Sequence, residues 1–124
     1  PVRMIHDNLI IGCLHFYEVD YQRKRILAIL GIEPRSEIVN NVNNKLLFQY
    51  IIDSCKTQAE RLGFNTLCLP VNPTMHSNRG EIGTQIAEAI REKEELPIEI
   101  EFPKEHREYK TGGLRVIWEN KKAA

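Results

Sequence analysis

Two titratable side chains occupy positions where acid–base chemistry is feasible. Glu33 directly follows the apolar run Ile26 to Ile32, so its carboxylate could act as a general base through a water molecule if that end opens into a cleft. His76 lies in the polar loop Asn72 to Ser77, where an accessible imidazole could exchange a proton near neutral pH. The structural alternatives are a strand-terminal carboxylate and an ordinary loop histidine.

Cys13 and His15 form a second candidate pair, two residues apart in the apolar stretch Leu9 to Val19. Residues at this spacing share one face of a strand, so the imidazole could activate the thiol as a nucleophile. Packing of both side chains in the core is the alternative. Neither CxxC nor another metal-ligand spacing occurs, so we expect small buried thiols and no metal site at Cys13, Cys55 and Cys68.

Composition limits the class of protein. The chain has 124 residues, 17 Lys plus Arg against 17 Asp plus Glu, 42% hydrophobic and 27% charged residues. These values predict one domain spanning 1–124. Because the charges balance, the composition gives no strong indication of nucleic-acid binding. The basic cluster Gln22 to Arg25 is expected to be a solvated hairpin tip. Apolar runs too short to cross a bilayer and the lack of a signal-peptide pattern lead us to expect a cytoplasmic protein without membrane contact.

The elements that must position these side chains follow from hydrophobic periodicity. The helices repeat apolar residues at three- and four-residue steps, whereas the strands alternate or are apolar throughout. The expected elements are strands Val2–Ile5 and Leu9–Val19 joined at Asp7–Asn8, strand Ile26–Ile32, helix Asn44–Leu62, strand Asn65–Val71, helix Glu81–Glu94, half-exposed strand Ile98–Phe102, and its hairpin partner Leu114–Trp118.

The order β-β-β-α-β-α-β-β predicts an α/β (α+β) fold with a mixed, mostly antiparallel sheet of six or seven strands. The run from Ile26 through the helix to Val71 is typical of a β-α-β crossover. Because the strands are apolar on two sides, we expect one helix on each face of the sheet. A ligand site is expected at the carboxyl end of Ile26–Ile32.

This order resembles the GNAT (Gcn5-related N-acetyltransferase) superfamily from its second strand onward, without the first strand and first two helices. Gly12 follows apolar residues here much as a glycine often does in the family's third strand. The resemblance implies transfer of an acyl group from acyl-CoA to a small-molecule or peptide amine. It also implies cofactor-binding positions at Ile32, Arg35, Ser36, Asn40 and Asn78.

Two departures from the family pattern affect this expectation. The stretch Arg35 to Asn40 has no glycine, and Glu37 places a carboxylate where the family binds pyrophosphate. Gln85 stands where the family commonly has a tyrosine, and an amide cannot protonate a departing thiolate as a phenol can. We therefore expect weaker acyl-CoA binding and a divergent or inactive enzyme.

Two other classes of function stay open. One is a non-catalytic α/β interaction domain or a fragment of a larger protein, with contacts to the parent chain or to a second copy. The other is a tautomerase-like enzyme in which the secondary amine of Pro1 is the general base.

Overall fold

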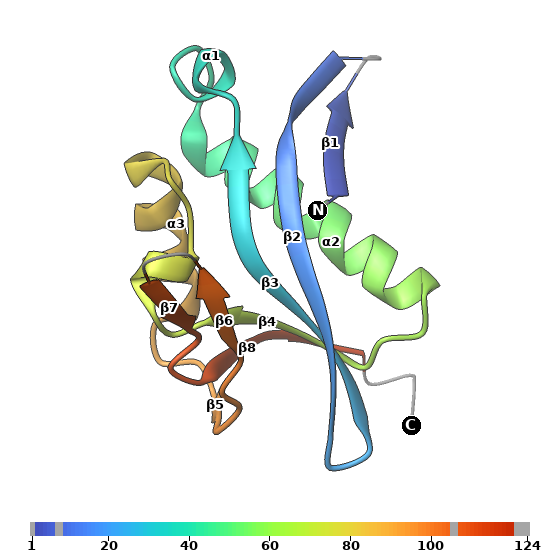
Figure 1. Ribbon diagram of the computed structural model, residues 1–124. Helices are drawn as coiled ribbons and strands as arrows, with labels where there is room; N and C mark the ends of the chain where they lie inside the picture. The colour runs from blue at the N-terminus through green and yellow to red at the C-terminus, as the bar shows by residue number, and fades with distance from the viewer. Residues whose placement is uncertain (1, 7–8, 105–106, 121–124) are drawn as a thin grey trace.

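The computed structural model describes residues 2–6, 9–104 and 107–120. Within these ranges a six-stranded mixed sheet has the order β1-β2-β3-β4-β8-β5, and β6 and β7 form a separate ribbon (Figure 1). The predicted class and the mostly antiparallel sheet are confirmed. The strands are β1 (Val2–His6), β2 (Leu9–Tyr21), β3 (Lys24–Pro34), β4 (Thr66–Pro70), β5 (Glu95–Leu96), β6 (Glu101–Lys104), β7 (Arg107–Lys110) and β8 (Leu114–Glu119).

The helical elements are α1 (Ser36–Val39), α2 (Asn44–Arg61), the 3-10 turn η1 (Pro73–Met75) and α3 (Gly80–Ile90). The side chain of Asn43 caps α2 by accepting a hydrogen bond from the backbone N–H of Leu46. Gly63, at φ 80°, follows the C-terminus of α2 and allows the chain to turn towards β4. Neither α1 nor η1 was expected from periodicity, because each is about one turn long.

β3 is the central strand and begins the predicted crossover. It pairs antiparallel with β2 and parallel with β4, and α2 connects β3 to β4. The parallel pairing covers only Ile26 to Ala28 against Thr66 to Cys68. Beyond this point the two strands separate, and the backbone N–H of Ile32 donates to the carbonyl of His76 at 2.9 Å. The segment that follows β4 therefore lies beside the second half of β3, where β4 no longer pairs with it.

A β-bulge divides β3 into two halves. Phe16 pairs with Ile29 and His15 with Gly31, so Leu30 is an extra residue. The bulge shifts the alternation of side chains by one position. As a result, Leu27, Ile29 and Ile32 all belong to the core that contains the helices. Gly31 and Glu33 are turned to the opposite side of the sheet, which we call the outer face.

Both main helices lie on one face of the sheet, so the expectation of one helix on each face is wrong. Phe48 and Cys55 of α2 share a core cluster with Ile82 and Ile86 of α3. The amphipathic pattern of α3 shows that one side of the helix is buried, but it does not specify which face of the sheet it covers.

The other face is covered by irregular backbone instead of a helix. Ile98 and Ile100 pack with Met75 of η1 against the side chains of Ile26 and Ala28. The alternating burial expected over Ile98–Phe102 is present at residues 98–101, but residues 97–100 form no strand, and β6 begins only at Glu101.

Thr111 explains this irregular segment. Its hydroxyl accepts from the N–H of Ile100 and donates to the carbonyl of Ile98, each at 3.0 Å. A side chain therefore replaces part of a strand ladder. The expected pairing of Ile98–Phe102 with Leu114–Trp118 is wrong, because β8 pairs with β4 and β5 and β6 pairs with β7.

Some expectations fall outside the described residues. These include the Asp7–Asn8 turn and the proposed general base Pro1. Among the helices that the structure describes, none is long and apolar enough to cross a bilayer.

Candidate functional site

The carboxyl end of β3 is joined to the segment before α3. The Oε2 atom of Glu33 accepts the backbone N–H of Asn78 at 2.9 Å. The Nε atom of Arg79 donates to the carbonyl of Pro34 at 3.1 Å. Together with the bond from Ile32 to His76, these contacts hold the two segments side by side. The structure thus brings Glu33 and Asn78 together, as their predicted membership of one site requires.

Glu33 is the titratable group most clearly placed for chemistry. Its side chain is half-buried on the outer face, where it remains partly accessible to water. The N–H of Asn78 fixes one carboxylate oxygen, which orients the group. A carboxylate that is oriented and partly accessible can accept a proton directly or through one water molecule.

The residues expected to bind a cofactor are placed less favourably. Ile32 is fully buried, and its N–H is already bonded to His76. Arg35 lies 3.4 Å from Glu37 in an ion pair, and both side chains are exposed. Ser36 begins the four-residue helix α1, and Asn40 follows its end. This single turn offers few free N–H groups to an anion.

Glu37 opposes an anion at this turn. Backbone N–H bonding and the Arg35 guanidinium lower the pKa of Glu37, so the side chain is negatively charged at neutral pH. A phosphate approaching α1 would meet this charge and would have to compete for Arg35.

His76 is not the exposed loop histidine that its sequence context suggested. It is 3% exposed, and its Nε2 atom is hydrogen-bonded to the carbonyl of Pro70. Burial lowers its pKa, although the bond to Pro70 acts in the opposite direction. The reason is that residues 72–76 pack into the gap beside β3 instead of extending into water. His76 therefore closes this end of the sheet, and no accessible proton-transfer geometry supports its predicted catalytic role.

The outer face brings together a group of side chains around Cys13. Strand pairing places Arg3, Cys13 and Glu33 in one row across β1, β2 and β3. His15 is exposed, which contradicts core packing for this residue. The Sγ atom of Cys13 lies 3.9 Å from Nε2 of His15.

Two members of this group, Arg3 and Gly31, were not singled out by the sequence. A Cβ atom on Gly31 would lie 3.1 Å from Cδ2 of His15 and 3.6 Å from Oε1 of Glu33. The imidazole and the carboxylate therefore border the same space above Gly31. Correct strand register, including the bulge, is needed to recognise this arrangement, and it cannot be read from residue spacing.

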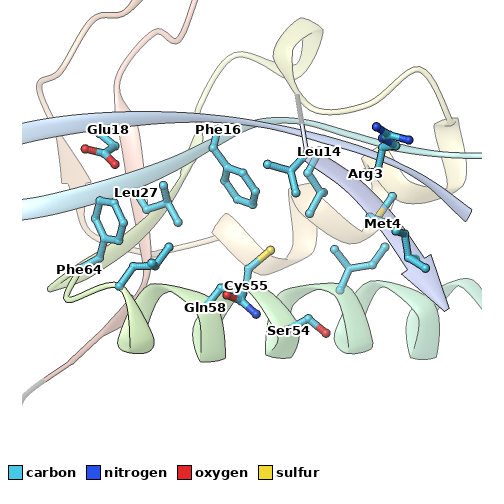
Figure 2. Close-up of a pocket in the computed structure, with 14 residues that line it drawn as sticks. Arg3, Met4, Leu14, Phe16, Glu18, Leu27, Ser54, Cys55, Gln58 and Phe64 are labelled. Carbon is cyan, nitrogen blue, oxygen red and sulfur yellow. The ribbon is translucent and has the colours of Figure 1, made fainter. Parts of the chain in front are cut away.

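A groove of about 680 Å³ lies on the opposite side, between α2 and strands β1 to β3 (Figure 2). It is lined mainly by apolar side chains, including Met4, Phe16 and Phe64, with Ser54 and Gln58 on the helix. Figure 2 shows that Arg3, although at its margin, points away from α2. The groove does not include Glu33, Arg35 or Ser36.

Comparisons with family models, curated proteins and solved structures find no match for this chain. Among the described residues there is also no group of three or more His, Cys, Asp or Glu side chains arranged to hold a metal ion.

Proposed function

We propose that this protein is a divergent acyltransferase of GNAT type, which transfers an acyl group from a thioester donor to an amine. The observation that supports this proposal most is the separation of the parallel strands after Ala28 and Cys68. The longer strand then carries Glu33 beyond the segment that fills the gap between the strands, and there its half-buried carboxylate is oriented by the N–H of Asn78. Strand ends that diverge in this way are common places for ligand sites in α/β proteins.

Glu33 is the general base in this proposal. An amine is mostly protonated at neutral pH and becomes a nucleophile only after losing a proton. The half-buried carboxylate of Glu33 can accept that proton directly or through one water molecule. The deprotonated amine then attacks the thioester carbonyl, the carbon–sulfur bond breaks, and the donor leaves as a thiol after protonation.

The donor end of the site is poorly suited to the pyrophosphate of acyl-CoA. Arg35 and Ser36 could contact a phosphate, but Glu37 opposes it and the N–H of Ile32 is occupied. We therefore assign acyl-CoA as a weakly held donor. The acceptor is an amine of a small molecule or peptide.

An assay of thiol release from acetyl-CoA, with and without a panel of small amines and lysine peptides, tests this function. The wild-type protein should release thiol in an amine-dependent manner. Glu33→Gln should lower the rate by about 100-fold or more, because a lost general base costs this much. Glu60→Gln, an exposed change on α2, is the charge-matched control and should behave as wild type. Absence of amine-dependent release by the wild type would contradict the proposal.

A second candidate, an interaction domain, is favoured by the groove beside α2. β1 lies at the end of the sheet order, and the nearby Val2, Ile5 and Leu62 are 50%, 60% and 52% exposed. An unpaired strand edge beside an apolar groove is a common peptide-binding surface. Leu62→Asp should weaken partner binding in this case but leave amine-dependent thiol release unchanged.

A further inference from the structure

The three cysteines differ in their surroundings. Cys55 and Cys68 are buried at 2% and 0% exposure. Burial raises the pKa of each thiol to about 12, so neither forms a thiolate at neutral pH. Cys13 is half-buried on the outer face of β2. It is therefore the cysteine that an external reagent can reach.

The neighbours of Cys13 suit a reactive thiol. Arg3 is its partner on β1 and provides a positive charge on the same face. The Nε2 atom of His15 lies 3.9 Å from the sulfur, which is within hydrogen-bond distance for sulfur. Glu33 is the partner on β3, but one of its oxygens is engaged by the N–H of Asn78. Nearby arginine and histidine stabilise a thiolate, and reactive cysteines are typically found in such partly exposed surroundings.

Gly31 makes room for this group. Any larger residue would place its Cβ 3.1 Å from the ring of His15. The absence of a side chain there lets the imidazole lie across β3, with the Glu33 carboxylate bordering the same space.

We propose that Cys13 is a nucleophile that accepts an acyl group from a thioester on the outer face of the sheet. The Cys13 thiol gives its proton to Nε2 of His15, and the sulfur attacks the thioester carbonyl. The bond from carbon to the donor sulfur breaks, and the leaving thiolate takes the proton from His15. One thioester replaces another, so no oxidant or reductant is needed.

The second half of the reaction rests on the function proposed above. An amine deprotonated by Glu33 attacks the acyl group on Cys13, and the Cys13 thiol is regenerated. Acyl transfer then proceeds in two steps through the protein, in place of direct transfer from donor to amine. The imidazole of His15 and the carboxylate of Glu33, which both lie beside Gly31, act in separate steps: His15 in the first and Glu33 in the second.

Mass spectrometry of the full chain after incubation with S-acetyl-N-acetylcysteamine tests the first step. This small thioester lacks a nucleotide, so weak pyrophosphate binding does not limit the experiment. We expect one hydroxylamine-labile acetyl group on the peptide that contains Cys13. Cys55 and Cys68 should react at least about 100-fold more slowly and serve as internal controls. Equal or faster labelling of Cys55 or Cys68 would overturn the inference.

Two variants test the neighbours. His15→Gln should slow acetylation of Cys13 about tenfold or more at pH 7. Arg3→Gln should also slow this acetylation, because the attacking sulfur loses a positive charge on the same face of the sheet. Arg23→Gln removes the same charge at the far end of the hairpin and should leave the rate of acetylation unchanged. All three side chains are exposed, so the variants should fold, and unchanged rates of acetylation in both Arg3→Gln and His15→Gln would contradict the role of Cys13.

Cys13→Ser separates this inference from the proposed function. If Cys13→Ser retains amine-dependent thiol release, transfer is direct, so the nucleophile is overturned while the function stands. If Cys13 of the wild type is acetylated but no amine stimulates thiol release, the proposed function fails while the reactive thiol stands.

Discussion

At the residue scale, His76 illustrates how burial changes what a histidine can do. The neutral ring is favoured because the surrounding protein excludes water, which lowers its pKa. Its hydrogen bond to Pro70 and the bond from Ile32 to its carbonyl fix the segment that fills the gap beside β3. The residue thus holds the backbone together at this end of the sheet.

The lowered pKa of His76 predicts a pH-dependent stability. The unfolded chain takes up the proton first as the pH falls below about 6.5, so acid favours unfolding. The stabilisation is fully present above that pH and is lost as the pH falls towards the folded-state pKa. The free energy of unfolding, measured with urea at several pH values, should depend less steeply on pH in His76→Gln than in the wild type. His15→Gln, on the exposed face, is the control, and an unchanged slope in His76→Gln would refute this assignment.

Glu37 should limit acyl-CoA binding. Glu37→Gly removes the negative charge, releases Arg35 from its ion pair and lets the backbone approach the ligand. We expect about two- to fivefold tighter binding by calorimetry at low salt, with a smaller gain at high salt because charges are screened. Glu37→Gln separates the charge from the backbone effect. Equal affinities of all three proteins at low salt would favour the interaction domain.

At the scale of elements, the turn between β2 and β3 contains strain. Gln22 and Arg23 have φ values of 48° and 67°, a conformation that glycine and asparagine tolerate better. Replacing the pair by Asn-Gly should raise the free energy of unfolding by about 1 kcal/mol. Arg23→Ala keeps the unfavourable φ and should change stability by less than about 0.5 kcal/mol. Chemical denaturation measures both, and no gain from Asn-Gly would argue against strain here.

Helix α2 has a buried side and a polar side, and we expect substitutions on the two sides to change the free energy of unfolding by different amounts. Phe48 and Ile52 are 7% and 5% exposed against the sheet. Phe48→Ala or Ile52→Ala should lower the free energy of unfolding by about 2–5 kcal/mol through cavity formation. Equilibrium denaturation would contradict this packing if either loss were below about 1 kcal/mol.

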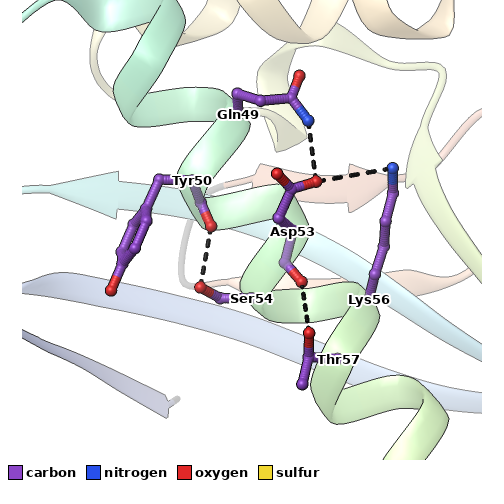
Figure 3. A network of polar contacts seen from close by, with 6 residues as sticks. All are labelled: Gln49, Tyr50, Asp53, Ser54, Lys56 and Thr57. Carbon is purple, nitrogen blue, oxygen red and sulfur yellow. Dashed lines mark hydrogen bonds and ion pairs between the residues drawn. The ribbon is translucent and has the colours of Figure 1, made fainter.

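The polar side of α2 supplies the control for these core substitutions. Asp53 accepts from Gln49 at 2.9 Å and lies 3.9 Å from Lys56 in a surface network (Figure 3). Exposed pairs of this kind contribute little. Lys56→Ala should therefore change the free energy of unfolding by less than about 0.5 kcal/mol.

The sequence predicts these elements better than it predicts their arrangement. Apolar repeats located α2 within one residue at its C-terminus and identified the buried run of β3. The bulge at Leu30 and the cover provided by Thr111 depend on contacts between distant segments. No local pattern carries that information, which is why the face covered by α3 and the partner of β8 were predicted wrongly.

At the scale of the whole molecule, the two faces of the sheet offer different surfaces. The outer face carries Cys13, His15 and Glu33, whereas the helical face has the apolar groove. The position of Glu33 near the end of a buried strand was predicted from its place after an apolar run. The sequence did not predict that Arg3 and Gly31 lie near Cys13, because strand register alone brings these residues together.

The most direct test of where the donor binds is a titration of the ¹⁵N-labelled protein with acetyl-CoA, followed by proton–nitrogen correlation spectra. Donor binding at the carboxyl end of β3 should shift the amide signals of residues 31–40 and 76–79 and leave those of Ser54, Gln58 and Leu62 in place. Shifts confined to the groove beside α2, or none at saturating acetyl-CoA, would contradict the proposed site.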